Sequence, residues 1–352
     1  MIDTIDVRPG EELDMPRLEA YLRANLDGAE GEFGLRQFGG GHANLTYLLK
    51  FGEREFVLRR PPHGPLPAGG HDMKREYRVL SELWKAFPLA PRAFLLCTDH
   101  DVLGVDFVVM ERRNGVVIRR ELPPQLLDDR AAQRHLGENF IDVLAALHNV
   151  DYVACGLADL GKPEGYLQRQ MDGWIKRWYA AETDDRPAAE DVIAWLTAHQ
   201  PSQSGSSVIH NDYKLDNTIV SERDLQTFVA VLDWDMSTLG DPLSDLGNVL
   251  ALWVEPGDPP SLQHSTMPIA GPGFPTRREI VERYAAKTGR DVTHVGWYRA
   301  FNVFRYAVID QQIYVRYRRG QTHDDRFKDL GFVVSQLIET SRELVSAGTP
   351  LT

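Results

Sequence analysis

The chain has 352 residues, of which 43% are hydrophobic, and this length and composition suit two domains or lobes with a sizeable core. Its formal net charge of −12 argues against a nucleic-acid-binding protein, because such proteins usually present a basic face. Two cysteines are too few for a disulfide framework, and neither a signal peptide nor a run of about 18 apolar residues is evident, so we expect a cytoplasmic protein with no nucleic-acid and no membrane partner.

The first part of the chain alternates between short strands and helices. Apolar residues at helical spacing predict a helix over 13–26 and another over 71–87, the second after a Pro/Gly-rich loop. Short strand-like runs are expected at 33–38, 44–51, 55–60, 93–97 and 106–110. These elements predict an N-terminal lobe, residues 1–111, with an N-terminal helix, a five-stranded sheet and one inserted helix.

The remaining residues, 112–352, have a different pattern. Helical stripes of apolar residues occupy 124–149, 164–181 and 187–199, and the chain after Asp241 is mainly helical. A short β-rich segment lies between these helices, at 207–233. The whole chain is therefore expected to adopt an α+β fold, with a β-rich first lobe, a mainly helical second lobe and a cleft between them.

A polar loop in the β-rich segment has the pattern H-x-D-x-x-x-x-N, formed by His210, Asp212 and Asn217 within residues 208–221. Asn and Asp favour turns, so a plain turn would explain the pattern in most proteins. Here apolar runs on both sides would hold the loop in place. Asp212 can then act as the catalytic base for an attacking hydroxyl, and Asn217 can offer its amide oxygen to a metal. His210 belongs to this catalytic loop, where we expect it to brace the backbone more than to react.

A second acidic segment, residues 229–245, begins its polar part with D-x-D at Asp233. A carboxylate at the end of a buried strand is costly unless it is paired or bound to metal. Together with Asn217, sixteen positions earlier, Asp233 predicts a Mg²⁺ site. Asp235 is either a further metal ligand or a cap of the next segment. Two more acids stand at the start of a helix, where carboxylates suit the helix dipole, and we interpret them as structural: Asp241 and Asp245.

The glycine-rich turn between the first two strands has the form G-x-G-x-x-N. Its residues are Gly39, Gly40, Gly41 and, at the end of the pattern, Asn44. Glycines at such a turn let backbone amides approach phosphate oxygens, although glycine-rich hairpin turns are also common without a ligand. The turn is neither a P-loop nor a Rossmann turn, because no Gly-Lys-Ser/Thr and no helix follows it.

The third strand carries Arg59 where kinases usually have a lysine for the α- and β-phosphates, since no lysine occurs between Lys50 and Lys74. Arginine can bind phosphate through two hydrogen bonds, so the role can be kept. Glu76 lies on the apolar face of the 71–87 helix and is the expected partner of Arg59. The alternative is that both are ordinary surface charges.

In these residues the chain resembles the aminoglycoside phosphotransferase and choline kinase-like family, which shares the protein-kinase-like fold. The matching pieces occur in the family's order between about residues 37 and 250: GGGHANLTYLL, EFVLRRPP, DFVVMER, LAALHNVD, VIHNDYKLDNTIV and VLDWDMSTLGDPLSDLG. The resemblance implies ATP or GTP in the cleft, with Mg²⁺ held by Asn217 and Asp233, and with Asp212 as the base. It also implies that the adenine lies near three residues at the end of the last strand of the first lobe: Met110, Glu111 and Arg112.

The turn and the FVLRRPP run look most like the branch of the family found beside or fused to acyl-CoA dehydrogenases. This likeness implies a functional link to such a dehydrogenase and a hydroxylated acyl-CoA as the acceptor. An aminoglycoside or choline kinase, or a weakly catalytic nucleotide-binding module, are the alternatives, and only Arg59 in place of lysine favours the last of them.

The charge of the second lobe bears on the acceptor. Residues 251–330 carry a net charge of +3, and four arginines lie close together in sequence: Arg305, Arg316, Arg318 and Arg319. They can coat a solvated helix face or attract an anionic acceptor. Since like charges in a cleft are costly, we expect an anionic or neutral acceptor more than a polycationic aminoglycoside.

Overall fold

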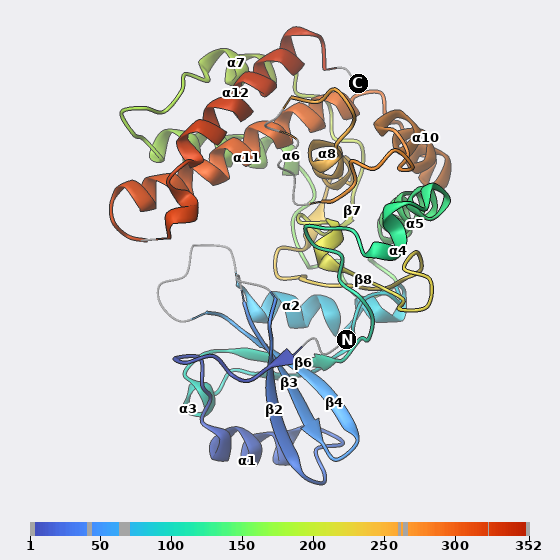
Figure 1. The fold of residues 1–352 in the computed structure, drawn as a ribbon, viewed down its shortest axis with the longest axis vertical. Coiled ribbons are helices and arrows are strands. Elements are labelled where there is room, and N and C mark those ends of the chain that lie inside the picture. Colours follow the sequence, from blue (N-terminus) through green and yellow to red (C-terminus); the bar gives the residue numbers. More distant parts are fainter. Residues whose placement is uncertain are drawn as a thin grey trace.

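The computed structural model describes residues 4–40, 44–62, 71–259, 262, 267–322 and 324–349. The chain forms two lobes, a β-rich N-terminal lobe and a mainly helical C-terminal lobe, which confirms the predicted α+β class (Figure 1). The last strand of the first lobe ends at Glu111, where we divide the lobes. No helix in the described part of the chain is long and apolar enough to cross a membrane.

The first lobe is built on an antiparallel sheet with the order β1-β2-β3-β4-β6-β5. Its strands are β1 (Thr4–Ile5), β2 (Phe33–Phe38), β3 (Leu45–Phe51), β4 (Arg54–Arg60), β5 (Ala93–Cys97) and β6 (Phe107–Glu111). The expected five-stranded sheet is therefore wrong by one strand. The additional strand, β1, pairs Thr4 with Phe38 at the sheet edge. Two residues are too few to show a strand periodicity, so only the pairing with β2 reveals β1.

Two helices flank the strands of this lobe, and an aspartate caps the first turn of each helix. The side chain of Asp14 accepts a hydrogen bond from Arg17 N at the start of α1 (Met15–Asn25), and Asp72 accepts one from Arg75 N at the start of α2 (Met73–Leu80). The helix expected over 71–87 ends at Leu80 and is followed by a 3-10 turn, η1 (Leu83–Lys85). A further short helix, α3 (His100–Leu103), was not expected, so the inserted helix is not the only one in this lobe.

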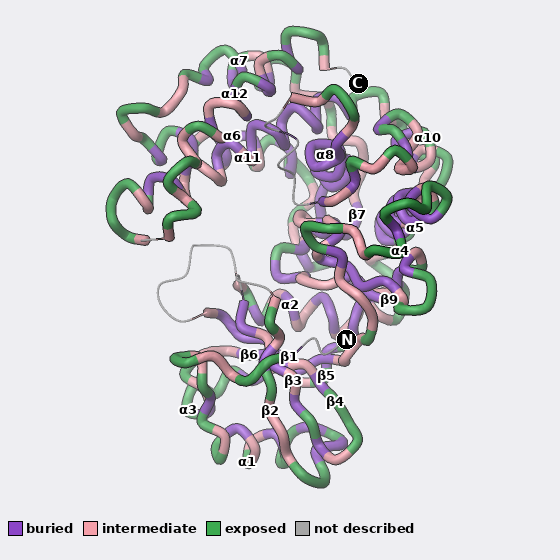
Figure 2. Tube along the Cα trace, in the orientation of Figure 1, coloured by how far each residue is buried: buried purple, intermediate pink, exposed green. Residues whose placement is uncertain are grey.

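The second lobe is mainly helical. Its described helices are α4 (Pro124–Leu127), α5 (Arg130–His148), α6 (Tyr166–Ala180), α7 (Glu190–Ala198), α8 (Leu243–Leu252), α10 (Arg277–Thr288), α11 (Val295–Arg318) and α12 (Leu330–Ser346), with a 3-10 turn, η3 (Asp325–Phe327), before α12. The helix expected over 124–149 is divided because the side chain of Asp129 caps α5 by accepting from Ala132 N. Helix α8 is buried along its whole length (Figure 2), and α11 packs against α6, α8 and α12.

Four short strands position the polar segments of the sequence. β7 (Ser207–Ile209) pairs with β10 (Thr238–Gly240), and β8 (Thr218–Val220) pairs with β9 (Phe228–Val231). A 3-10 turn, η2 (Leu215–Asn217), leads into β8. The H-x-D-x-x-x-x-N loop thus lies between β7 and β8, and the D-x-D segment lies between β9 and β10. Each polar segment is held at both ends by a ladder of backbone hydrogen bonds.

The main apolar core continues from the second lobe into the first. Phe87, Val108 and Met110 belong to the same buried cluster as Trp234 and the helices of the second lobe. A smaller cluster fills the space between α1 and the sheet. Because α2, η1 and one face of the sheet share the main core, the two lobes are joined by packing as well as by the chain.

Candidate active site

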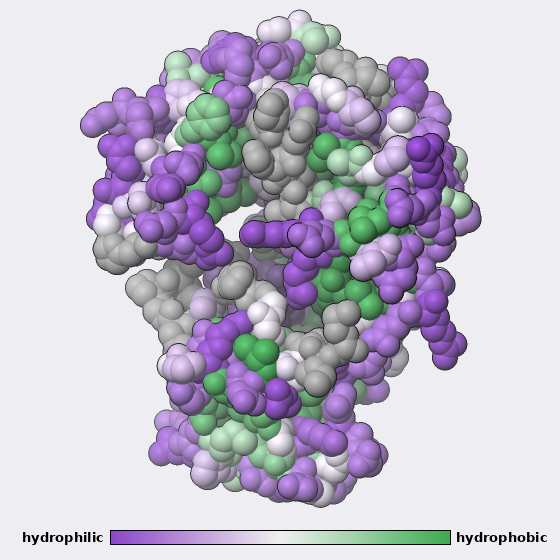
Figure 3. Space-filling model, viewed as in Figure 1, coloured by the Kyte–Doolittle hydropathy of each residue, from purple (hydrophilic) through white to green (hydrophobic). Residues whose placement is uncertain are grey.

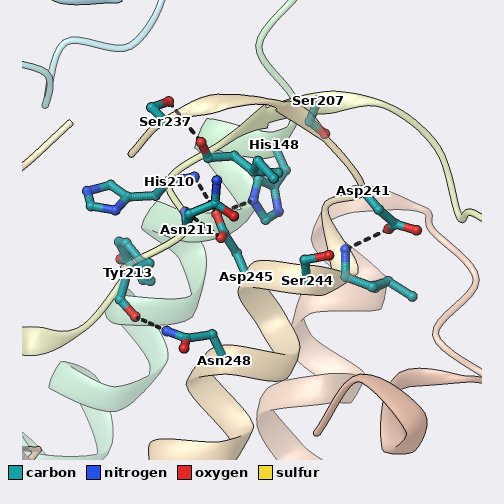
Figure 4. A network of polar contacts seen from close by, with 12 residues as sticks. His148, Ser207, His210, Asn211, Tyr213, Ser237, Asp241, Ser244, Asp245 and Asn248 are labelled. Atoms are coloured by element: carbon teal, nitrogen blue, oxygen red, sulfur yellow. Dashed lines mark hydrogen bonds and ion pairs between the residues drawn. The ribbon is translucent and has the colours of Figure 1, made fainter. Parts of the chain in front are cut away.

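The catalytic loop between β7 and β8 is held from below by one carboxylate (Figure 4). Asp245, in the first turn of α8, accepts from His210 N at 2.6 Å and from Asn211 N at 2.8 Å. Asn211 has a φ of 67°, a left-handed conformation that costs energy in a residue with a side chain. Asp245 therefore holds the backbone of the loop in a strained conformation. This role is more specific than the one expected from the sequence, that of an acid at the start of a helix.

The buried charge of Asp245 has its own support. His148 of α5 lies with its Nε2 3.3 Å from Asp245 Oδ2, and the Nδ1 of His148 lies 2.7 Å from the hydroxyl oxygen of Tyr284. Burial alone would raise the pKa of the Asp245 carboxyl, but His148 and the amides of the loop lower that pKa below its usual range. The loop is thus anchored by the ionised carboxylate of Asp245, which lies on α8 and contacts both α5 and the loop.

His210 braces the loop, as expected, and does not reach the cleft. It is fully buried, its Nε2 lies 2.8 Å from the carbonyl oxygen of Leu232, and its ring packs against Trp234 with the centroids 4.8 Å apart. These contacts tie the catalytic loop to the strand end that precedes Asp233. We therefore treat His210 as a positioning residue.

Asp212 and Asn217 are brought together by the loop. The side-chain amide of Asn217 donates to Asp212 Oδ2 at 2.8 Å and to the carbonyl oxygen of Asp212 at 2.9 Å. Lys214 is a further residue of the site that was not predicted, and its Nζ lies 3.2 Å from Asp212 Oδ2 and 3.9 Å from Asp216 Oδ2. Burial would lower the pKa of Lys214, but these two carboxylates raise it above its usual value. The position of a lysine between two acids of the motif was the available signal.

Arg59 and Glu76 form a buried ion pair, as predicted, so the surface-charge alternative is wrong. Arg59 is 7% exposed and Glu76 is fully buried. The guanidinium of Arg59 also pairs with Asp233, a contact that was not expected. Burial would raise the pKa of Asp233, but Arg59 holds it below the usual range. Burial raises the pKa of Glu76 to about 7 in spite of Arg59, and the charges of Asp233 and Asp235 act in the same direction as burial.

Asp235 links the D-x-D segment to the first lobe. Its Oδ2 accepts from Asn44 Nδ2 at 3.0 Å and from His71 N at 3.2 Å, and His71 Nδ1 lies 2.7 Å from Asn44 Oδ1. Burial and the neighbouring charge of Asp233 raise the pKa of Asp235. The residue is thus engaged with the end of the glycine turn, and its role as a metal ligand stays a prediction.

The residues around Asp233 fit a divalent cation. Leu232 N donates to the carbonyl oxygen of Asn217 at 2.8 Å, so Asn217 and Asp233 are neighbours. The single guanidinium of Arg59 faces three carboxylates here, and one of their oxygens, Glu76 Oε2, is buried without a hydrogen-bond partner among the described residues. A cation with two charges would balance this excess, and carboxylate and amide oxygens are ligands that Mg²⁺ prefers.

The protein supplies only part of such a metal site. Among the described residues, no group of three or more His, Cys, Asp or Glu side chains could hold a metal ion. Mg²⁺ usually takes one or two protein oxygens and completes its octahedron with phosphate and water. Asn217 and Asp233 meet that requirement, with the remaining ligands coming from a nucleotide.

The predicted nucleotide contacts are described in part. Gly41 lies outside the described residues, whereas Gly39 and Gly40 follow β2 directly. Met110 is buried on β6, and Glu111 N donates to the carbonyl oxygen of Arg92 at 2.8 Å. The guanidinium of Arg112 lies over the ring of Phe38, 4.9 Å from its centroid. The segment is firmly held at the cleft, and its contact with adenine stays a prediction.

The four arginines of the second lobe do not form one surface. Arg305 is buried and donates to the carbonyl oxygen of Asn211 at 2.8 Å and to Asn302 Oδ1 at 2.9 Å. Arg318 pairs with Asp185 at 2.9 Å, and the remaining two, Arg316 and Arg319, are exposed at the end of α11. The sequence spacing of these arginines therefore does not support a preference for an anionic acceptor.

One face of α11 lies beside the catalytic loop. The hydroxyl of Tyr306 donates to Asn248 Oδ1 at 2.7 Å, and Asn248 Nδ2 donates to the carbonyl oxygen of Tyr213 at 3.3 Å, so Tyr306 lies near the catalytic loop. One helical turn later, burial raises the pKa of Asp310 to about 6. The surface is hollowed between the first lobe and the ends of α11 and α12 (Figure 3).

Comparison with known proteins agrees with this geometry. Residues 34–275 match the family model described as the phosphotransferase enzyme family. The chain is 32% identical over 340 residues to mouse acyl-CoA dehydrogenase family member 10 and 31% identical over 351 residues to rat acyl-CoA dehydrogenase family member 11. These alignments cover 96% and 97% of the chain but only 32% and 44% of the two relatives, so the chain spans less than half of either protein.

Solved structures show the same fold. A Ralstonia eutropha protein assigned to the aminoglycoside phosphotransferases is 31% identical, with a TM-score of 0.80 over 96% of this chain and 99% of that one. A choline kinase from Cryptosporidium parvum is 12% identical, with a TM-score of 0.61 over 96% and 98%, and shares the fold alone. The protein-kinase-like two-lobe fold is thus confirmed. The chain belongs to the phosphotransferase enzyme family, and its two lobes are those of a kinase-like phosphotransferase.

Proposed function

We propose that the chain is a small-molecule kinase that transfers the γ-phosphoryl group of ATP, with Mg²⁺, to a hydroxyl group. The observation that carries this proposal is the convergence of Asp212, Asn217 and Asp233 from two loops that short strand ladders hold in place. A solved relative with 14% identity and a TM-score of 0.57 is a ternary complex with ADP and hygromycin B, which supports an adenine nucleotide. GTP, the other nucleotide expected from the resemblance, has no such support.

In the proposed reaction Asp212 receives the proton of the acceptor hydroxyl. The hydroxyl oxygen forms a bond to the γ-phosphorus in line with the bridging oxygen, the bond to that bridging oxygen breaks, and ADP leaves with the electron pair. Asn217 fixes the Asp212 carboxylate through its side-chain amide. Asp245 and His210 fix the loop, so the base needs no rearrangement before transfer. Mg²⁺, when bound by Asn217 and Asp233, would neutralise charge on the phosphates.

For the acceptor we propose a hydroxyacyl-CoA or a related metabolite. The support is that the chain aligns with part of two longer relatives named as acyl-CoA dehydrogenase family members, so a kinase of this type occurs in one polypeptide with the rest of those proteins. A functional link to an acyl-CoA dehydrogenase follows as part of the proposal. An aminoglycoside- or choline-type acceptor is the second candidate, supported by the names of the structural neighbours.

The test is a phosphoryl-transfer screen with ATP and Mg²⁺ over hydroxyacyl-CoA thioesters, choline-like amines and aminoglycosides. Each reaction would be followed by ADP release and by mass spectrometry of the acceptor, with Asp212→Asn as the matched inactive control. With a hydroxyacyl-CoA we expect a product about 80 Da heavier than the acceptor, because a phosphoryl group replaces a proton. Transfer to kanamycin-like compounds and to no thioester would refute this acceptor class.

A catalytically weak nucleotide-binding module is favoured by one observation only. Arg59 replaces the usual lysine and is engaged by both Glu76 and Asp233. Such a module would gain thermal stability from Mg·ATP and yet form no ADP with any acceptor of the screen. Measurable ADP formation that depends on Asp212 would exclude it.

A further inference from the structure

The segment that connects the lobes after β6 is fixed beside the catalytic loop. Val116 pairs with Val220 of β8 through two backbone hydrogen bonds, of 2.8 and 2.9 Å. A side chain at Gly115 would collide with the carbonyl oxygen of Val220, so the glycine permits this close approach. Ile118 is buried in the main core. Since β8 begins directly after Asn217, these contacts place the backbone of Arg119 near the exit of the catalytic loop.

The side chain of Arg119 extends from this fixed point to the glycine turn. A Cβ atom built on Gly40 would lie 2.5 Å from Arg119 Cζ, so the guanidinium lies directly against the turn. Arg119 thus lies between the turn expected to cover the phosphates and the loop that carries the base.

Arg119 differs from the other cations of the site because its guanidinium is available. Arg59 is paired with two carboxylates, Lys214 lies between two others, and Arg305 bonds to the catalytic loop and to Asn302. Within the described ranges, no hydrogen bond or ion pair engages Arg119, which is exposed. The backbone near Arg119 is fixed, and its exposed guanidinium can donate hydrogen bonds to an anion that binds between the lobes.

We propose that Arg119 is a phosphate-binding arginine that contacts the transferring phosphoryl group, supplied by the connector of the same chain. This inference rests on the proposed kinase function. Arg119 makes and breaks no covalent bond. Its guanidinium donates hydrogen bonds to oxygens of the γ-phosphoryl group, whose negative charge is shared with the leaving oxygen during transfer. An arginine in this role is worth about 10³–10⁵ in rate in other phosphoryl-transfer enzymes.

The test uses ADP, Mg²⁺ and aluminium fluoride, which together mimic the group in transfer and need no acceptor. Binding of this mixture and of Mg·ADP alone would be measured by calorimetry for the wild type and three variants. The variants are Arg119→Ala, Arg119→Lys and, as the matched control, Arg120→Ala, which removes the neighbouring exposed arginine. We expect the preference for the fluoride complex to fall about 100-fold or more in Arg119→Ala, partly in Arg119→Lys and less than threefold in Arg120→Ala.

The possible outcomes separate this inference from the proposed function. A wild type that binds no adenine nucleotide would refute both. A wild type that binds Mg·ADP without preferring the fluoride complex, or an Arg119→Ala variant that behaves like Arg120→Ala, would refute only the role of Arg119. Equal weakening of Mg·ADP and the fluoride complex in Arg119→Ala would also overturn it, because the contact would then be made in the ground state.

Discussion

Replacing Arg59 with alanine tests the buried charge cluster at the centre of the site. The change removes the guanidinium that contacts both Glu76 and Asp233 directly. Removing one partner of a buried ion pair costs about 3–5 kcal/mol of unfolding free energy, because the other charge stays buried without compensation. We expect this full cost at pH 8.5, where both carboxylates are ionised.

The cost in unfolding free energy of Arg59→Ala should be smaller at low pH, because Glu76 is then protonated. Burial raises the pKa of Glu76 from 4.5 to about 7, so the folded protein takes up a proton that the unfolded chain has already lost between these values. The stability from this group is present below about pH 4.5 and is lost as the pH rises through about 7. At pH 5.5 Glu76 is mainly neutral and Asp233 is the one contacting carboxylate left charged, so Arg59→Ala should cost less than at pH 8.5, about 3 kcal/mol or below.

Urea denaturation at pH 5.5 and 8.5 measures both values. The double variant Arg59→Ala/Glu76→Gln is the control, because it lacks the carboxyl group that titrates. Its cost in unfolding free energy should therefore be nearly the same at pH 5.5 and at pH 8.5. A cost below about 1 kcal/mol at pH 8.5, or equal costs at both pH values in the single variant, would refute a buried pair coupled to Glu76.

Three further changes probe the chemistry and the second lobe. Asp212→Asn should lower kcat by about 10² or more with nucleotide affinity nearly intact, and near-normal turnover would remove Asp212 from the mechanism. Asp233→Ala should abolish the Mg²⁺-dependent part of nucleotide binding in calorimetry, whereas an unchanged affinity for Mg·ATP would exclude Asp233 as a ligand. Burial raises the pKa of Asp310 to about 6, so its stability contribution is lost as the pH rises through that value. Asp310→Asn should therefore raise the unfolding free energy at pH 8 by up to about 3 kcal/mol and leave it unchanged at pH 4; equal effects at both would contradict this.

The local parts of the site could be predicted from the sequence. The spacing of Asp212 and Asn217 describes one loop, and its apolar flanks predict the strands that hold it. Glu76 was placed on the inner face of its helix by periodicity alone, and the ion pair with Arg59 confirms that placement. These inferences succeed because the relevant contacts depend on helix and strand geometry over a few residues.

The contacts that join distant segments could not be predicted. Asp235 and Asn44 are 191 positions apart, and Asp245 reaches back 35 positions to His210. No periodicity reports such pairs, because they depend on how the lobes and α8 are packed. The same holds for Arg119, which looks like any exposed arginine until the connector is seen to pass the glycine turn.

The three residues from Asp233 to Asp235 carry two hydrogen-bonded links between the lobes, one to Arg59 and one to the Asn44–His71 pair. The same carboxylate of Asp233 is the proposed metal ligand, so a cation and Arg59 compete for its charge. Metal binding and separation of the lobes are then thermodynamically linked. Withdrawing Mg²⁺ would leave Arg59 as the partner of Asp233 and strengthen this link between the lobes, whereas a bound cation would weaken it.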